Sequence, residues 1–207
     1  MSHLPRYNSK IRKYDRNYSN MLLAKTISSK LSFNNRTFFN VNFRGARLRK
    51  FKLTNCNFIL CDFSGTIMNK GKFTNVLFKK CVFCASILRG SIFKNCKFQE
   101  CFFINMSEDI ISNCEMENCL SYNYYDLTIP LEASHDFDFT KEYHIFQKNR
   151  LIHIKGGKVN KATIFIILQY MPYNVFIRKL KKLCENNLQR KIFTVMRLLE
   201  ILQKTRY

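Results

Sequence analysis

The sequence is short of acidic residues, since its 207 residues include 14 aspartates and glutamates against 35 lysines and arginines, a formal charge of +21. It also lacks an apolar run that could span a bilayer, because Gln169, Pro172 and Asn174 interrupt the longest one, residues 162–176. The N-terminus has no apolar core of the kind found in signal peptides. These absences predict a soluble chain with an anionic partner, such as an acidic protein, nucleic acid or acidic lipid.

The patterns that carry catalysis or cofactor binding are missing too. Cys81 and Cys84 form a CxxC pair, but no second pair follows at a zinc-binding spacing, so both are expected to be structural thiols. The histidines show no metalloprotease spacing, and no glycine-rich phosphate loop is present. Neither His135-Asp136 nor Cys184 stands in a pattern that would make it catalytic. We therefore expect a protein that is not an enzyme and holds no cofactor or metal.

Large apolar residues recur at every fifth position from residue 33 to residue 103, which gives fifteen consecutive matches. The residue two positions before each is mostly small or apolar, and often cysteine. A period of five fits neither the helical period nor the alternation of a strand. The central positions are Phe33, Phe38, Phe43, Leu48, Leu53, Phe58, Phe63, Met68, Phe73, Phe78, Phe83, Leu88, Phe93, Phe98 and Phe103.

Like residues also recur twenty positions apart, notably asparagines at 35, 55, 75 and 95. Such spacing favours stacked coils, because like rings stack and like amides hydrogen-bond along a column. Four sides of five residues make a square coil with the central side chains inside it. The expected inward columns contain Phe38, Phe43, Phe58, Phe63, Phe78, Phe83, Phe98, Phe103, Cys61, Cys81 and Cys101.

These positions resemble the pentapeptide-repeat family, in which a central Leu or Phe follows a small residue two positions earlier, often with Asn or Asp between them. CNF at 56–58 and CDF at 61–63 match this pattern closely. The resemblance covers about residues 31–105 and implies a mainly β fold, a right-handed quadrilateral β-helix. Arg36 and Phe51 depart from the pattern.

Three parts are expected along the chain. Residues 1–30 would be a disordered basic N-terminus followed by a capping helix over 18–30, because an open β-helix end exposes unpaired backbone. Residues 31–121 would form the β-helix, with a register slip of three after Phe103 that makes Met106, Ile111 and Met116 central in a degraded last coil. Residues 122–207 would be an irregular acidic linker followed by a small helical cap or subdomain. Its helices are expected near 160–170, 173–185 and 188–204.

Basic residues recur along one edge of the expected coil and would stack into a cationic stripe. The stripe would bind an anionic partner or only keep the column soluble. Residues 106–140 hold eight acidic residues and no lysine or arginine, so we expect this band to neutralise part of the charge and to be able to dock on the stripe. The stripe consists of Arg49, Lys50, Lys52, Lys70, Lys72 and Arg89.

Several functions stay open at this point. Without a catalytic pattern, the first expectation is a non-catalytic scaffold for protein–protein interaction. The alternative is a basic surface that binds nucleic acid or acidic membrane. The layout also resembles bacterial type III effectors of the SopA/NleL type, HECT-like ubiquitin ligases, which implies a secreted effector or a truncated relative that reaches host cells. Family members that mimic DNA and bind gyrase are acidic along the column. The repeat of this chain is basic instead, so DNA mimicry is not expected here. Nine cysteines, most of them in the repeat, predict reduced thiols and a cytoplasmic location.

Overall fold

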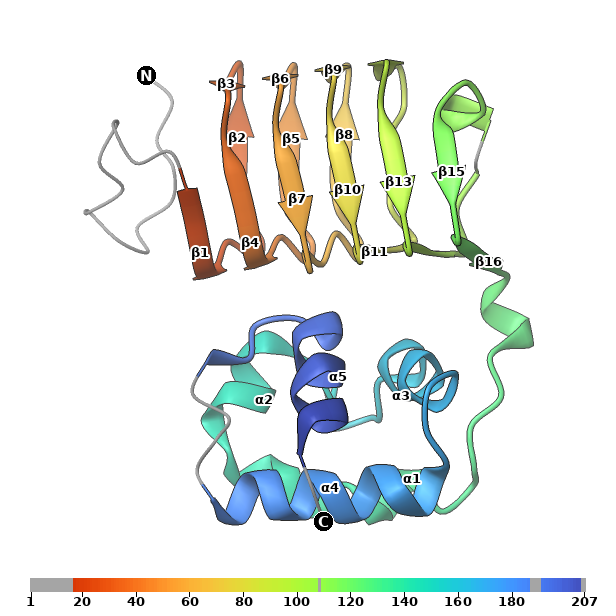
Figure 1. The fold of residues 1–207 in the computed structure, drawn as a ribbon. Coiled ribbons are helices and arrows are strands. Elements are labelled where there is room, and N and C mark those ends of the chain that lie inside the picture. Colours follow the sequence, from red (N-terminus) through yellow and green to blue (C-terminus); the bar gives the residue numbers. More distant parts are fainter. Residues whose placement is uncertain (1–16, 108, 187–190, 206–207) are drawn as a thin grey trace. The chain divides into compact units, whose positions relative to one another are not determined.

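The computed structural model describes residues 17–107, 109–186 and 191–205. The chain divides into two compact units, Met1–Asn123 and Tyr124–Tyr207. In the described residues the first unit is a parallel β-helix and the second is helical (Figure 1). The disorder expected for residues 1–17 falls outside the described residues, except that Asn17 opens a strand.

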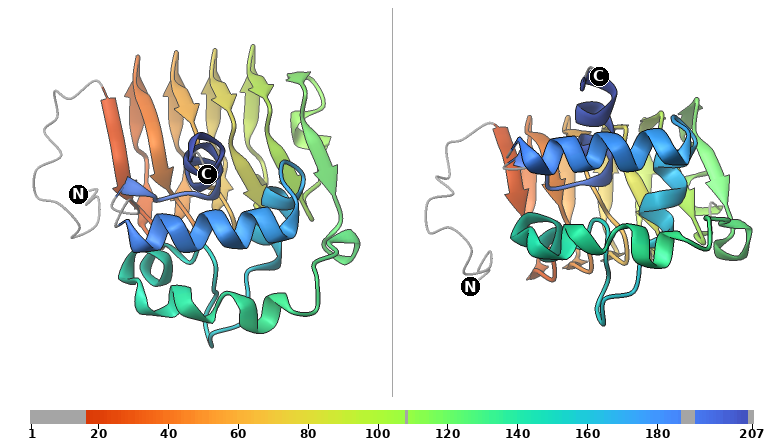
Figure 2. Two further views of the ribbon diagram at one scale, coloured as in Figure 1. Left: turned by 60° about the horizontal axis from the view of Figure 1, so that its bottom comes forward. Right: turned by 90° about the horizontal axis from the view of Figure 1, so that it is seen from below.

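Short parallel strands stack into four sheets, one for each side of the coil (Figures 1 and 2). Most strand residues pair with the residue twenty positions away, as Phe58 does with Phe78, so the expected β-helix is confirmed. The first side carries β1 (Asn17–Leu22), β4 (Thr37–Asn42), β7 (Asn57–Ile59), β10 (Leu77–Lys79), β13 (Lys97–Gln99) and β15 (Glu115–Glu117). The second carries β11 (Val82–Cys84), β14 (Phe102–Ile104) and β16 (Leu120–Tyr122). The third carries β2 (Ile27–Ser29), β5 (Arg47–Arg49) and β8 (Ile67–Asn69), and the fourth carries β3 (Ser32–Asn34), β6 (Lys52–Thr54), β9 (Lys72–Thr74) and β12 (Ile92–Lys94).

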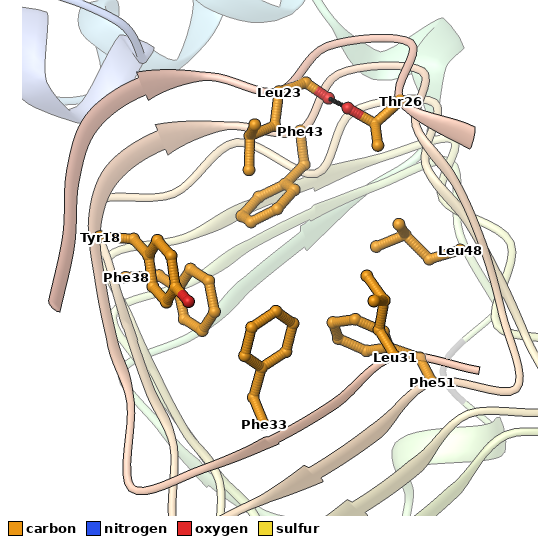
Figure 3. A pocket seen from close by; sticks show the side chains of 9 residues that line it. All are labelled: Tyr18, Leu23, Thr26, Leu31, Phe33, Phe38, Phe43, Leu48 and Phe51. Carbon is orange, nitrogen blue, oxygen red and sulfur yellow. Dashed lines mark hydrogen bonds between the residues drawn. The ribbon is translucent and has the colours of Figure 1, made fainter. Parts of the chain in front are cut away.

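The interior of the coil is filled by columns of stacked aromatic rings. Phe78 stacks on Phe58 and on Phe98 with ring centroids 5.2 and 4.7 Å apart and planes within 14°. It also meets Phe83 of the neighbouring column edge-to-face at 5.5 Å. Offset and edge-to-face pairs each add about 0.5–1.5 kcal/mol beyond the burial of apolar area. Figure 3 shows side chains from the different sides converging in the first coils.

Each corner is turned by a residue in the left-handed conformation. Every fifth residue from Asn20 to Asn105 has a positive φ, between 50° and 67°. Glycine and asparagine tolerate this conformation best, which explains why both recur at the spacing of a coil. The expected bond between stacked amides also occurs, since the Asn75 side chain donates to Oδ1 of Asn55 at 3.0 Å.

The capping helix expected over residues 18–30 is wrong. These residues form β1, a left-handed corner and β2, which together make the first coil of the β-helix. Tyr18 pairs with Phe38 in register, and their rings stack at 4.8 Å. Asn20 lies within this segment and turns a corner with φ 54°. Tyr18 and Leu23 therefore continue the five-residue pattern, and residues 17–30 belong to the β-helix.

The last coil forms with the shifted register that the sequence predicts. Met116 pairs with Phe98, and Ser121 pairs with Phe103, so partners are eighteen residues apart, as in the Lys97–Glu115 pair. On the fourth side a 3-10 helix, η1 (Asp109–Ile111), replaces the strand, and Ile111 is buried in the core of the β-helix.

The second unit contains short helices and one small hairpin. Its elements are η2 (Tyr124–Asp126), α1 (Ala133–Asp136), η3 (Asp138–Glu142), α2 (His144–Asn149), α3 (Lys161–Leu168), α4 (Tyr173–Glu185) and α5 (Val195–Lys204). The start of the third helix expected over 188–204 lies outside the described residues. Within the described part of the chain α5 begins at Val195, where Thr194 is extended and its hydroxyl accepts the Arg197 backbone N–H at 3.3 Å. Among the described residues, no helix combines the length and apolarity needed to span a bilayer.

Candidate anion-binding surface

The predicted cationic residues lie on the third and fourth sides of the β-helix and on the corner between them. Arg49 ends β5, and Lys52 and Lys72 open β6 and β9. Lys50 and Lys70 occupy left-handed corner positions, with φ 53° and 55°. Lys52 faces Lys72 directly across neighbouring strands. Since strands lie about 4.8 Å apart, the structure places cations at regular intervals along the column.

The remaining predicted residue, Arg89, follows on the third side, where its carbonyl accepts the Lys70 N–H at 3.0 Å. The structure adds two cations that the sequence analysis missed. Lys30 turns the same corner one coil earlier, and Arg47 stands in register between Ile27 and Ile67. All of these side chains are exposed. We call this set the cationic edge: Lys30, Arg47, Arg49, Lys50, Lys52, Lys70, Lys72 and Arg89.

Lys30 was missed because its segment was assigned to a helix. Once the first coil is recognised, a spacing of twenty residues from Lys50 would have found it. Arg47 was missed because its column otherwise holds isoleucine, so that no charge repeats there.

Carboxylates are scarce in the coils that carry the cationic edge. Between residues 17 and 97 the sequence holds a single carboxylate, Asp62, which accepts a hydrogen bond from Arg44 Nη2 at 2.7 Å. The ion pairs among the described residues include none from the cationic edge. The edge therefore keeps its positive charge without a paired carboxylate in the described part of the chain.

The acidic band is paired with other lysines. Glu115 and Glu117 accept from Lys97 Nζ at 2.6 and 2.8 Å, and this contact holds the pKa of Glu117 below its usual value. Asp138 pairs with Lys141 at 2.6 Å. The acidic band therefore neutralises part of the basic charge, at Lys97 and Lys141. Among the described residues, no ion pair joins the band to the cationic edge.

The repeat cysteines are placed as donors inside the coil. Cys61 and Cys81 lie in one column, and the Cys81 thiol donates to the Phe58 carbonyl at 3.3 Å. Burial raises the pKa of the Cys81 thiol well above its usual value, which opposes formation of a nucleophilic thiolate. Cys101 continues the column and donates to the Phe78 carbonyl at 3.4 Å.

The other residues considered for chemistry are also placed. Burial raises the pKa of Cys84 to about 11 and that of Cys184 to about 12. Asp136 accepts a hydrogen bond from the Tyr173 hydroxyl at 2.9 Å, while His135 is exposed. Within the described residues, no group of three or more His, Cys, Asp or Glu side chains is arranged to hold a metal ion.

Comparison with known proteins gives one sequence match. Residues 42–79 match the family described as pentapeptide repeats, with eight copies. No curated protein matches the chain. The matched segment lies inside the coils described above, which carry the same five-residue spacing from Tyr18 to Phe103.

Solved structures with some similarity include the pentapeptide repeat protein Rfr23 from the cyanobacterium Cyanothece 51142. The two sequences are 8% identical, and the TM-score is 0.27. The alignment covers 51% of this chain and 80% of Rfr23. A trypsin-treated variant of QnrB1, a plasmid-mediated fluoroquinolone resistance protein, shows 14% identity, with 53% of this chain and 90% of that chain covered and a TM-score of 0.19. The family match and the coil seen in this chain agree on the same repeat. Residues 42–79 therefore match the pentapeptide-repeat family, and the coils on either side of them carry the same five-residue spacing.

Proposed function

We propose that this chain is a non-catalytic scaffold that binds an anionic partner, another protein, through the cationic edge. The observation that carries the proposal is the stacking of cations in register without paired carboxylates, as in Lys52 and Lys72. Like charges directly opposite each other destabilise a sheet, so this arrangement has a cost that a bound anion would offset.

A purely solubilising role explains the arrangement less well. Lysines protect a sheet against aggregation where they stand on edge strands with unpaired backbone groups. The cationic edge lies instead along the sides of the column, where the backbone is paired to both neighbouring coils. The Lys52 N–H donates to the Leu31 carbonyl at 2.8 Å, and the Lys72 N–H donates to the Phe51 carbonyl at 2.7 Å. Edge protection is therefore not needed at these positions.

The coil also suits a binding role because it holds these side chains at fixed intervals. Ladder hydrogen bonds and buried central side chains fix the backbone beneath the cations, with Leu48 and Met68 on the third side and Leu53 and Phe73 on the fourth. A preorganised surface loses little conformational entropy on binding, which favours affinity for a partner with matching charges.

The test is the salt concentration that elutes the purified full chain from immobilised heparin, a general polyanion. The test variant is Lys52→Glu/Lys72→Glu, and the control, Lys155→Glu/Lys158→Glu, changes the net charge equally at exposed positions of the second unit. We expect the test variant to elute at clearly lower salt, with the control close to the wild type. Equal shifts in both variants would show that net charge alone drives retention and would contradict the proposal.

A further inference from the structure

Exposed isoleucines lie beside the cationic edge on the same two sides of the β-helix. Ile27 is 71% exposed, Ile87 49% and Ile92 60%. Ile67 and Ile87 are bridged partners on the third side, and Ile92 stands in register with Lys72 on the fourth. An aliphatic column of Ile27, Ile67 and Ile87 therefore runs parallel to the cationic columns, interrupted by one arginine.

This mixture of side chains narrows the class of partner. Surfaces that bind single-stranded nucleic acid combine cations with aromatic side chains on which bases stack. The outward positions of the third and fourth sides, between residues 27 and 95, hold no aromatic residue in the described strands and corners. Protein interfaces, in contrast, join apolar side chains to arginines at their centres. The isoleucines and the lack of outward aromatic residues therefore favour a protein partner over single-stranded nucleic acid.

The spacing of the columns narrows the partner further. Neighbouring coils rise by about 4.8 Å, and one turn of an α-helix rises by about 5.4 Å. Over three steps these two rises drift apart by only about 2 Å. Side chains on one face of an extended strand repeat every ~6.8 Å, and over three steps they drift from the coils by about 6 Å. A helix lying along the column can thus present one side chain to each coil, and a strand cannot.

Resting on the proposed function, we infer that the partner presents an acidic amphipathic helix that lies along the column. Its aliphatic stripe contacts the isoleucine column, and a neighbouring stripe of carboxylates faces Lys50, Lys70 and the arginines of the third side. Positions i, i+3, i+4 and i+7 of such a helix form stripes of this kind.

The experiment measures binding of fluorescent probes to the full chain by anisotropy at physiological ionic strength. The probes are a helical peptide with adjacent leucine and glutamate stripes, a peptide of the same composition in scrambled order, and a DNA duplex of similar charge. We expect the striped peptide to bind at least ~10-fold more tightly than either other probe. The variant Ile27→Thr/Ile87→Thr, which changes the two most exposed members of the isoleucine column, should remove about 10-fold of that affinity and leave heparin elution unchanged. Threonine keeps the β-branched shape without the apolar surface.

Ile154→Thr is the matched control, because Ile154 is 40% exposed in the second unit, and it should bind the striped peptide as the wild type does. Equal affinity for the striped and scrambled peptides would overturn the helical partner. Tighter binding of the duplex would overturn the protein partner, both here and in the proposed function, and would leave only anion binding by the cationic edge. Failure of the wild-type chain to bind heparin would overturn that anion binding, on which the proposed function depends.

Discussion

Replacing Lys72 by glutamate is expected to stabilise the β-helix and to weaken anion binding at the same time. Lys72 faces Lys52 across neighbouring strands. With backbones about 4.8 Å apart, flexible side chains hold the two ammonium groups about 7 Å apart. At that distance the repulsion in water is about 0.6 kcal/mol, and screening by physiological salt reduces it to about 0.3 kcal/mol. Glutamate would turn this repulsion into an attraction of similar size, so stability should rise by about 0.5–1 kcal/mol.

The assay is the urea midpoint of the wild type, Lys72→Gln and Lys72→Glu at low and high salt. The neutral glutamine removes the repulsion without adding an attraction, so its midpoint should fall between the other two. High salt should shrink the differences, because both contributions are Coulombic. The same Lys72→Glu protein should elute from heparin at lower salt than the wild type. A glutamate variant less stable than the wild type at low salt, or stability differences that high salt does not reduce, would refute this account of the cationic edge.

Three further predictions concern the coil itself. Ala85→Gly should stabilise the chain by about 0.5–1 kcal/mol in urea unfolding, because Ala85 holds a left-handed corner (φ 51°) that glycine adopts without steric cost; a loss of stability would contradict it. Phe78→Ala should cost at least about 4 kcal/mol by the same measurement, since it removes a buried ring from two stacked pairs; a cost below ~2 kcal/mol would be inconsistent with a packed column. Burial raises the pKa of Cys114 to about 11 from 9.0, so native stability from this thiol is complete below pH 9 and is lost as pH rises through 11. The alkaline loss of stability should be shallower in Cys114→Ala than in the wild type, and an unchanged pH profile would count against it.

The five-residue spacing predicted the fold because it is imposed by the interior of the coil. A large side chain on every side and a small one before it leave few alternatives, so Phe58 and Phe78 could be assigned to one column before any coordinates. The first coil was not predicted because Ser28 stands at a central position and the apolar residues around Leu22 also suit a helix. The spacing of the left-handed corner residues would have indicated this coil, since Asn20 and Lys30 both stand at corner positions.

The outward positions were harder to predict because no packing rule fixes them. Six cations of the cationic edge were predicted because they recur at multiples of twenty positions. Residues that stack on neighbouring coils are separated by this spacing, as Lys52 and Lys72 are. The isoleucines beside them carry no charge and do not repeat in every coil, so no pattern of their own singled them out. Their positions, one residue before a central residue as at Ile87 and Ile92, are outward in the five-residue register, and the structure shows them exposed, with Ile92 at 60%.

The outward residues of the coil can indicate function, because packing of the interior does not determine them. On a pentapeptide coil the interior and the corners are dictated by the fold, so variation there reports mainly stability. The outward side chains are under no such constraint, and aliphatic groups exposed to water contribute nothing to the core. A side that repeats cations at a Coulombic cost, and places exposed isoleucine beside them, departs twice from what stability alone would select. Since both departures occur on the same two sides of the column, a shared binding partner explains them together, whereas solubility would account for the charges and leave the isoleucines unexplained.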